Sequence, residues 1–313
     1  MIASSSDTEP VSWAHPGSGS VDLTSVVERR AELLESGRRG VLSQDQSEEL
    51  DQLTAQVTEA LNAGRDSIRR LRPGRDDELL LRLAELESIH PFADPSDPDE
   101  IRSRSEGDRV CFVLENPALP GRPRNVVWVA LCDELPADMG QLLSPSRAPI
   151  TPEQATVAVF YSIWNIEPGL DGIPGGSALL ALAMAELGDR YPGIDTFTTL
   201  SPIPGFRSWL SDVDAPDDAD ETDRLTKQCA RYLCTTDEAG NPIDSVARFH
   251  MRNGARLWRL VPRGDLSERG QERSWGVMVN YRYSPEDLAE NKLRYSQGEL
   301  VLGDEVAQLL EAD

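Results

Sequence analysis

The stretch at residues 195–210, DTFTTLSPIPGFRSWL, constrains the fold of this chain more than any other segment. It begins as an alternating β-type run that includes Phe197 and Leu200, and this run stops at Ser-Pro-Ile-Pro-Gly. Each proline fixes its own φ and keeps the residue before it out of the α region, so the backbone here is extended and rigid. Ser201 therefore stands at a stiff strand end. Either Ser201 only begins a turn, or its hydroxyl takes part in a reaction.

Residue patterns divide the chain into two folded parts with a boundary near residue 75. Residues 1–20 are rich in Ser, Gly, Pro and acids, which predicts a disordered N-terminus. Residues 21–75 repeat apolar side chains at spacings of three and four as far as Leu71, which predicts a small domain of amphipathic helices. Residues 76–313 alternate strand and helix patterns, which predicts an α/β fold.

The second part opens with a short helix, and strands follow it. Two apolar runs separated by a Pro/Gly-rich turn predict an antiparallel pair, and a third buried strand and a long helix follow before the central strand. An acidic run at residues 211–223 predicts a linker exposed to solvent. The expected elements are strands at 110–114, 126–132, 156–164, 256–261 and 275–283, and helices at 79–89, 177–191, 227–234 and 244–253.

Composition excludes several classes of partner. The 313-residue chain has a formal net charge of −23, which repels phosphate backbones and anionic membranes, so we expect neither nucleic acid nor a membrane as a partner. Its four cysteines have no CxxC spacing, so we expect reduced thiols and no metal site. The N-terminal residues resemble neither a signal peptide nor an arginine-rich transit peptide, which leaves the cytoplasm as the expected location.

A glycine-rich turn at 169–177 lies between an expected strand and an expected helix. Free backbone N–H groups and the helix dipole can hold a phosphate at such a place, although many such turns bind nothing. The candidate ligand-binding residues are Gly169, Asp171, Gly172, Ile173, Pro174, Gly175, Gly176 and Ser177.

His250 is one of three histidines, and on a helix it would share a face with Val246 and Phe249. From the residues alone it is either a hydrogen-bonded core histidine or a titratable group of a site.

Four segments in this order, FYSIWNIEPGLDGI, LSPIPGFRSWL, ARFHMRNGARLWR and VNYRY, resemble the malonyl-CoA decarboxylase family. The similarity runs from about Leu79 to about Leu302. It implies an acetyltransferase-like catalytic domain that follows a helical, oligomer-forming domain, and the decarboxylation of malonyl-CoA to acetyl-CoA. By this resemblance Ser201 and His250 are catalytic, and the segment GLDGI, which matches the family pattern GLxGI, holds the diphosphate of coenzyme A. The implied partners are malonyl-CoA or a similar acyl-CoA, and a second copy of the chain in a dimer or tetramer.

We expect no separate cofactor, because the thioester carbonyl can itself take the electrons that are released as CO2 leaves. The loop departs from the family pattern at Ile166, Glu167 and Pro168. Two alternatives therefore stay open: a related coenzyme A-dependent acyltransferase or a decarboxylase acting on another acyl-CoA or on an acyl-carrier protein, and a non-catalytic acyl-CoA-binding protein. The presence of both Ser201 and His250 argues against the second.

Overall fold

The computed structural model describes residues 23–210 and 219–311. The N-terminus expected to be disordered, residues 1–20, lies outside the described residues, and so does most of the acidic run at 211–223. The end of that run is helical, because α8 (Ala219–Cys234) begins eight residues before the helix expected at 227–234.

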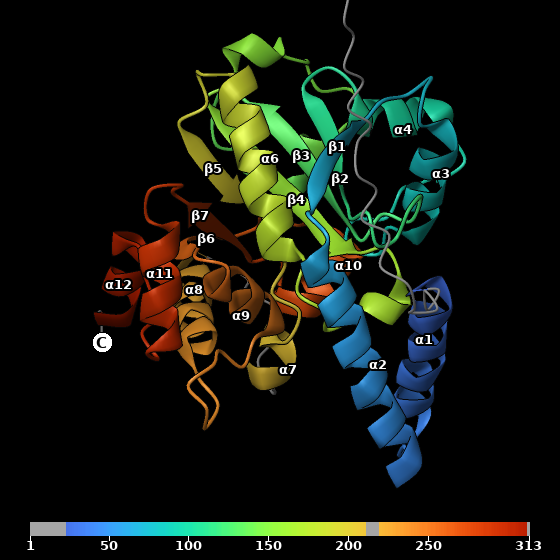
Figure 1. The fold of residues 1–313 in the computed structure, drawn as a ribbon. Coiled ribbons are helices and arrows are strands. Elements are labelled where there is room, and N and C mark those ends of the chain that lie inside the picture. Colours follow the sequence, from blue (N-terminus) through green and yellow to red (C-terminus); the bar gives the residue numbers. More distant parts are fainter. Residues whose placement is uncertain (1–22, 211–218, 312–313) are drawn as a thin grey trace, which may run out of the picture.

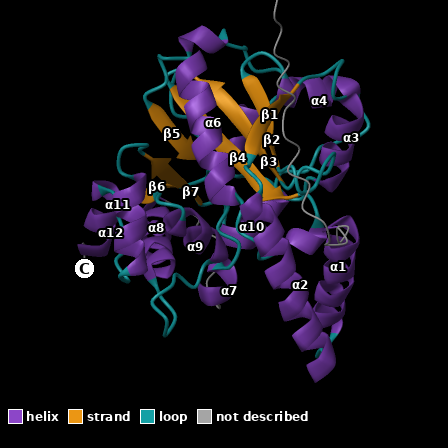
Figure 2. Ribbon diagram, viewed as in Figure 1, coloured by secondary structure: helices purple, strands orange, loops and turns teal. Residues whose placement is uncertain are grey.

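A seven-stranded sheet in the order β1-β2-β3-β4-β5-β7-β6 forms the centre of the molecule (Figures 1 and 2). All neighbouring strands are antiparallel except the parallel pair β4–β5. The mixed sheet confirms the expected α/β class. The strands are β1 (Ser67–Leu71), β2 (Arg109–Glu115), β3 (Asn125–Cys132), β4 (Val157–Asn165), β5 (Thr196–Thr199), β6 (Arg256–Val261) and β7 (Met278–Tyr283).

Strand β1 corrects the expected domain boundary. The spacing of apolar residues places 67–71 in the helical part, but these residues pair with β2 along their whole length. Only Leu71 of these five residues is buried, so the strand carries no clear two-residue period that would distinguish it from the preceding helices. The sheet domain therefore begins at about residue 67, and four strands rather than three precede the first long helix of that domain.

Helices cover both faces of the sheet. The long helix α6 (Gly176–Arg190) lies across one face, and α3 (Asp77–Leu86) and α4 (Pro98–Ser105) lie on the other (Figure 1). Strand side chains alternate between two separate cores, as a two-faced sheet requires. The remaining helices are α5 (Met139–Leu143), η1 (Pro152–Gln154), η2 (Pro168–Leu170), α7 (Phe206–Leu210), α9 (Ser245–Arg252), α10 (Glu268–Ser274), α11 (Leu288–Ser296) and α12 (Asp304–Glu311).

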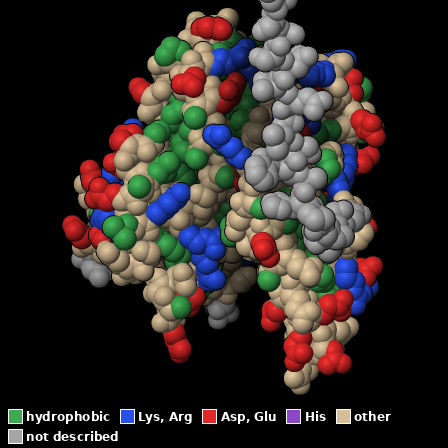
Figure 3. Space-filling view, in the orientation of Figure 1, with side chains coloured by type: hydrophobic (Ala, Val, Ile, Leu, Met, Phe, Trp, Pro, Cys, Tyr) green, Lys and Arg blue, Asp and Glu red, His purple; other side chains and the backbone are tan. Residues whose placement is uncertain are grey.

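The N-terminal helices α1 (Leu23–Arg39) and α2 (Gln44–Ala63) form a hairpin that projects from the sheet domain (Figure 1). The tip of this hairpin is mostly acidic on the visible face, whereas Lys and Arg side chains gather below α6 (Figure 3). At its base the hairpin shares a small core with the segment around η2, to which Val27, Leu170 and Ile173 contribute. The hairpin is therefore attached to the glycine-rich loop.

The parallel strands β4 and β5 separate toward their C-terminal ends. They pair only from Val157↔Thr196 to Phe160↔Thr199. The next residue, Tyr161, has no partner on β3, because the register shifts there from Val129↔Phe160 to Trp128↔Ser162. A bulge of this kind bends a strand, so the β5-side edge of β4 beyond Phe160 is left without a partner strand.

Candidate active site

Ser201 lies two residues beyond β5, at the point where β4 and β5 separate. Its backbone N–H donates to Val279 O at 2.9 Å and its carbonyl accepts from Val279 N at 3.0 Å, so β7 holds it in an extended conformation. Pro202 and Pro204 follow, as the rigid SPIPG segment predicted. The Ser201 residue is 5% exposed.

His250 lies on α9, which begins at an N-cap formed by Asp244. Its ring stacks on Tyr281 with a centroid distance of 4.5 Å, and the residue is 5% exposed. The fold brings it to Ser201: the Ser201 Oγ to His250 Nε2 distance is 3.2 Å. The two residues that the sequence singled out 49 positions apart therefore meet.

A chain of hydrogen bonds passes through the pair. His250 Nδ1 lies 2.8 Å from Tyr283 Oη, and Ser201 Oγ donates to Thr199 Oγ1 at 2.9 Å. The buried Tyr283 hydroxyl satisfies its donor if it gives its proton to Nδ1, which places the imidazole proton on Nε2, directed at Ser201. Sequence reasoning gave no role to Tyr283 or Thr199, although both belong to segments it had singled out.

Burial keeps His250 neutral. Loss of water around the ring lowers the pKa of His250 to about 3, because desolvation penalises the imidazolium. A neutral imidazole with one donor and one acceptor nitrogen can pass a proton along the chain without carrying a charge.

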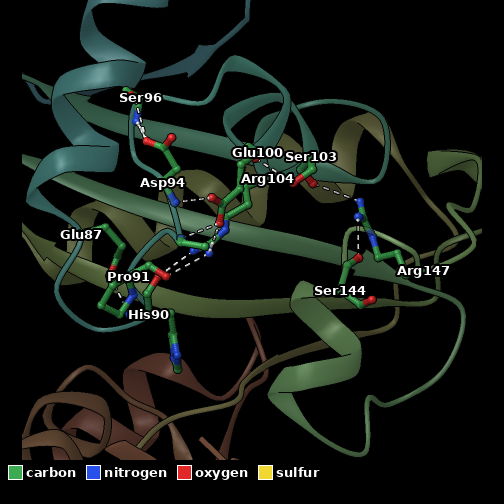
Figure 4. A network of polar contacts seen from close by, with 11 residues as sticks. Glu87, His90, Pro91, Asp94, Ser96, Glu100, Ser103, Arg104, Ser144 and Arg147 are labelled. Atoms are coloured by element: carbon green, nitrogen blue, oxygen red, sulfur yellow. Dashed lines mark hydrogen bonds and ion pairs between the residues drawn. The ribbon is translucent and has the colours of Figure 1, made fainter.

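A cavity of about 220 Å³ opens onto the pair from the gap between β4 and β5. Its walls come from β4, from the segment after β5, from α9 and α10, and from Ile89. Ile89 is held by Glu87, whose Oε1 accepts from its N–H at 2.7 Å and whose Oε2 accepts from Ser162 Oγ at 2.7 Å. Figure 4 shows this segment, from which the His90 ring points away from the polar contacts of Arg104.

The glycine-rich loop packs against helix α1. A Cβ on Gly169 would lie 2.0 Å from Val27 O, so glycine is required for this close approach. The buried Arg30 donates from Nη1 to Gly169 O at 2.6 Å and from Nη2 to Asp171 O at 2.8 Å. Gly172 has a φ of +80°, which also favours glycine.

The loop residues differ in what they can offer a ligand. The side chain of Ile173 is buried against the hairpin. Gly175 is the N-cap of α6 and lies against Asn125 and Arg124, and Pro174 O accepts from Arg124 Nη2 at 2.6 Å. Gly176 and Ser177 form the first turn of α6, where backbone N–H groups point out of the helix.

Two polar side chains from distant elements converge on that first turn. Lys292 on α11 donates to Ser177 Oγ at 2.7 Å. The buried amide Nδ2 of Asn253 has no hydrogen-bond partner among the residues that the structure describes, and it lies 3.7 Å from the position of a Cβ on Gly176. Sequence reasoning missed Lys292, although it is one of only two lysines in the chain, with Lys227.

The loop is also continuous with the cavity. A Cβ on Gly176 would lie 2.5 Å from the ring of Phe249, which itself lines the cavity beside His250. Because the C-terminal ends of parallel strands meet at one edge of a sheet, the loop after β4 and Ser201 after β5 lie at the same edge. An extended ligand can therefore contact both.

A family model described as malonyl-CoA decarboxylase C-terminal domain matches residues 67–228 and 214–313, which is most of the chain. The chain belongs to the malonyl-CoA decarboxylase family. The match begins at Ser67, the first residue of β1. Within the described residues, no group of three or more His, Cys, Asp or Glu side chains could hold a metal ion, and no helix is long and apolar enough to cross a membrane.

Two solved malonyl-CoA decarboxylases share this fold. The one from Agrobacterium vitis is 32% identical with a TM-score of 0.83 over 92% of this chain and 76% of that one. The one from Rhodopseudomonas palustris is 32% identical with a TM-score of 0.80 over 91% of this chain and 75% of that one.

Curated relatives are longer than this chain. The mitochondrial malonyl-CoA decarboxylase of Anser anser anser is 29% identical over 265 residues, 70% of this chain and 52% of that protein. That of Rattus norvegicus is 27% identical over 318 residues, 86% of this chain and 64% of that protein. The chain thus spans between half and two thirds of their length.

Proposed function

We propose that this protein decarboxylates malonyl-CoA to acetyl-CoA and CO2, with Ser201 and His250 as catalytic residues. The observation that carries the proposal is the 3.2 Å contact between Ser201 Oγ and His250 Nε2 at a cavity in the gap between β4 and β5. Membership of the family gives the reaction class.

The coenzyme would lie along the edge where α6 begins. Its diphosphate would accept from N–H groups of the first turn at Gly176 and Ser177 and from the side chains of Asn253 and Lys292. Residues 169–175 would shape this site through their backbone. The acyl end would then pass Phe249 into the cavity, where it reaches Ser201.

Decarboxylation breaks the bond between the carboxylate carbon and the α-carbon, and the electron pair moves into the thioester as an enolate. The β5-side edge of β4 beyond Phe160 offers backbone N–H groups that could stabilise this oxyanion. The thioester carbonyl accepts the electrons, so we propose that no separate cofactor takes part.

Proton delivery completes the reaction. The Ser201 hydroxyl would donate its proton to the α-carbon of the enolate, and His250 Nε2–H would replace it. After the products leave, water that enters the cavity would restore the proton to the pair, so that each turnover takes up one proton from solvent. The neutral state of His250 suits this transfer, because the ring already carries a proton on Nε2 and does not first have to become an imidazolium.

The departures of the loop from the family pattern do not place free negative charge beside the diphosphate. Glu167 is buried between Arg82 at 3.0 Å and Arg122 at 2.6 Å, and Asp171 pairs with Arg38 at 2.5 Å. This neutralisation removes a source of repulsion for a coenzyme A diphosphate, which every acyl-CoA carries, so the identity of the acyl group is left to the experiment below.

The decisive experiment is incubation of the purified protein with malonyl-CoA and mass spectrometry of the coenzyme products. We expect acetyl-CoA, and release of CO2 in equal amount. Parallel incubations with acetyl-CoA plus an amine acceptor, and with malonyl-acyl-carrier protein, test the alternatives. Unchanged malonyl-CoA together with turnover in either parallel incubation would refute the proposal.

We further propose that the α1–α2 hairpin joins copies of the chain into a dimer or tetramer. The cytoplasmic location expected from the sequence stays a prediction.

A further inference from the structure

One residue gives the cavity beside Ser201 its only charge. The walls are otherwise apolar or carry neutral polar groups. The residues that line the cavity are Ile89, Phe160, Tyr161, Ser162, Ile163, Ser201, Pro202, Pro204, Ser245, Val246, Phe249, His250 and Arg273. Arg273 is the single charged side chain among these described residues, since His250 is neutral.

The Arg273 guanidinium has no hydrogen bond or ion pair to any residue in the described ranges 23–210 and 219–311. The nearby Arg207 differs, because it donates to Gln271 O at 3.0 Å and lies over the Trp275 ring. Desolvation and then the positive charge of Arg269 lower the pKa of Arg273, and the carboxylate of Asp265 opposes both effects from beyond ion-pair distance. A half-buried guanidinium without a partner is costly unless a ligand pairs with it.

We propose that Arg273 binds the free carboxylate of the acyl group, so that the cavity selects acyl-CoA substrates that end in a carboxylate. This inference rests on the proposed function and adds the residue that distinguishes malonyl-CoA from its product. Arg273 presents up to five N–H donors in a planar fork that fits a carboxylate, and the apolar walls exclude the water that would weaken the pair.

The chemistry sets the kinetic consequence. The carboxylate loses its negative charge as it becomes CO2, so Arg273 stabilises the bound substrate more than the transition state. Removal of Arg273 should therefore raise both KM and kcat, in contrast to the loss of Ser201, which slows the chemical step and lowers kcat. Release of CO2 also releases Arg273, so the acetyl-CoA product binds without this contact.

The test compares Arg273→Ala and Arg273→Lys with Arg269→Ala. Arg269 is an exposed arginine on the same short helix and does not line this cavity. Turnover is measured with malonyl-CoA. Calorimetry measures binding of two probes that this mechanism does not decarboxylate: succinyl-CoA, which ends in a carboxylate, and acetyl-CoA, which does not.

For Arg273→Ala we expect KM for malonyl-CoA and Kd for succinyl-CoA to rise about 10-fold or more, the effect of losing a hydrogen-bonded charge pair. Acetyl-CoA affinity should stay near the wild-type value, and kcat should not fall below it. Arg273→Lys should recover part of the loss, and Arg269→Ala should change both constants far less than Arg273→Ala, because Arg269 does not line the cavity and reaches Arg273 only through its charge.

Equal losses for succinyl-CoA and acetyl-CoA would overturn the inference, because they would place Arg273 on the shared coenzyme or in the fold alone. Unchanged succinyl-CoA affinity would also overturn it. The binding data test the carboxylate site independently of the reaction. If the wild type forms no acetyl-CoA, the proposed function fails. A preference for succinyl-CoA over acetyl-CoA that disappears in Arg273→Ala would still support the carboxylate site.

Discussion

The Ser201 Oγ and the His250 Nε2 lie 3.2 Å apart, on elements separated by 49 residues in the sequence. Strand pairing with Val279 fixes the serine, and the stack on Tyr281 fixes the imidazole. Neither side chain has to move for a proton to pass between them.

If Ser201 and His250 act as one unit, the reductions in turnover caused by removing each side chain should not add. Ser201→Ala and His250→Ala should each lower turnover severely, and the double variant should be little slower than the slower single one. Turnover and thermal unfolding measured on the same three variants separate this from a structural role, which would destabilise the fold by about 0.5 to 3 kcal/mol and leave activity per folded molecule intact. Near-wild-type turnover of Ser201→Ala would refute the assignment.

Tyr283→Phe should slow turnover by about 10-fold or more without raising KM, because the donor that fixes the imidazole proton on Nε2 is lost. It should also cost about 1 to 3 kcal/mol of stability, since Nδ1 is left buried and unpaired. The matched control is Tyr281→Phe, which keeps the ring stacked on His250 and removes a hydroxyl that has no hydrogen-bond partner. Equal effects of the two changes would contradict the role given to Tyr283.

Stability should fall as the pH falls below 6.5. Burial lowers the pKa of His250 to about 3 and that of His90 to about 4, from an ordinary value of 6.5. Between each folded-state pKa and 6.5 the unfolded chain binds more protons than the folded one. The contribution of the two histidines to the free energy of unfolding is therefore fully present above pH 6.5 and is lost as the pH falls. For two such histidines the loss between pH 7.5 and 5.5 is about 2 to 3 kcal/mol.

Denaturant unfolding at those two pH values measures this loss. His90→Leu is the informative variant, since His90 lies outside the proposed chemistry and its Nε2 has no partner. We expect His90→Leu to show about half of the wild-type dependence on pH. A dependence equal to that of the wild type would show that His90 is not held neutral.

Arg30→Gln should weaken coenzyme A binding in calorimetry by about 3- to 30-fold, because two charged hydrogen bonds to the carbonyls of Gly169 and Asp171 disappear. Those bonds hold the loop against α1, so hydrogen exchange at residues 169–177 should become faster. Arg29→Gln is the control: it lies beside Arg30 but pairs only with Glu32 and Glu49 on the hairpin surface. Equal affinity in the two variants would show that the hairpin does not shape the site.

The proposed self-association can be tested at the tip of the hairpin, where Val41 is fully exposed between α1 and α2. Light scattering should show a dimer or tetramer for the full chain and smaller particles for Val41→Glu. Leu293→Glu places the same charge at an exposed leucine on α11 and should leave the mass unchanged. The same mass for all three proteins would exclude the hairpin tip as the contact.

Local patterns in the sequence predicted most of the elements that build the site. Strand β6 has the expected bounds, α6 and α9 differ from theirs by one residue at each end, and the rigid end of β5 follows from two prolines. These features depend on backbone sterics and on the period of burial, which act over a few residues. For the same reason β1 was missed, because five residues at the edge of the sheet with a single buried side chain give little periodic signal.

The sequence by itself determined that a fixed hydroxyl, a histidine and a glycine-rich turn exist, and the family resemblance supplied their roles. Only the tertiary structure decided that His250 reaches Ser201, that Tyr283 orients the imidazole, and that Arg30 holds the loop from 139 residues away. It also decided that Glu167 is neutralised and that Arg273 stands unpaired in the cavity. Such contacts depend on how whole elements pack, because each distance is set by the register of the sheet and the closing of distant loops rather than by neighbouring residues.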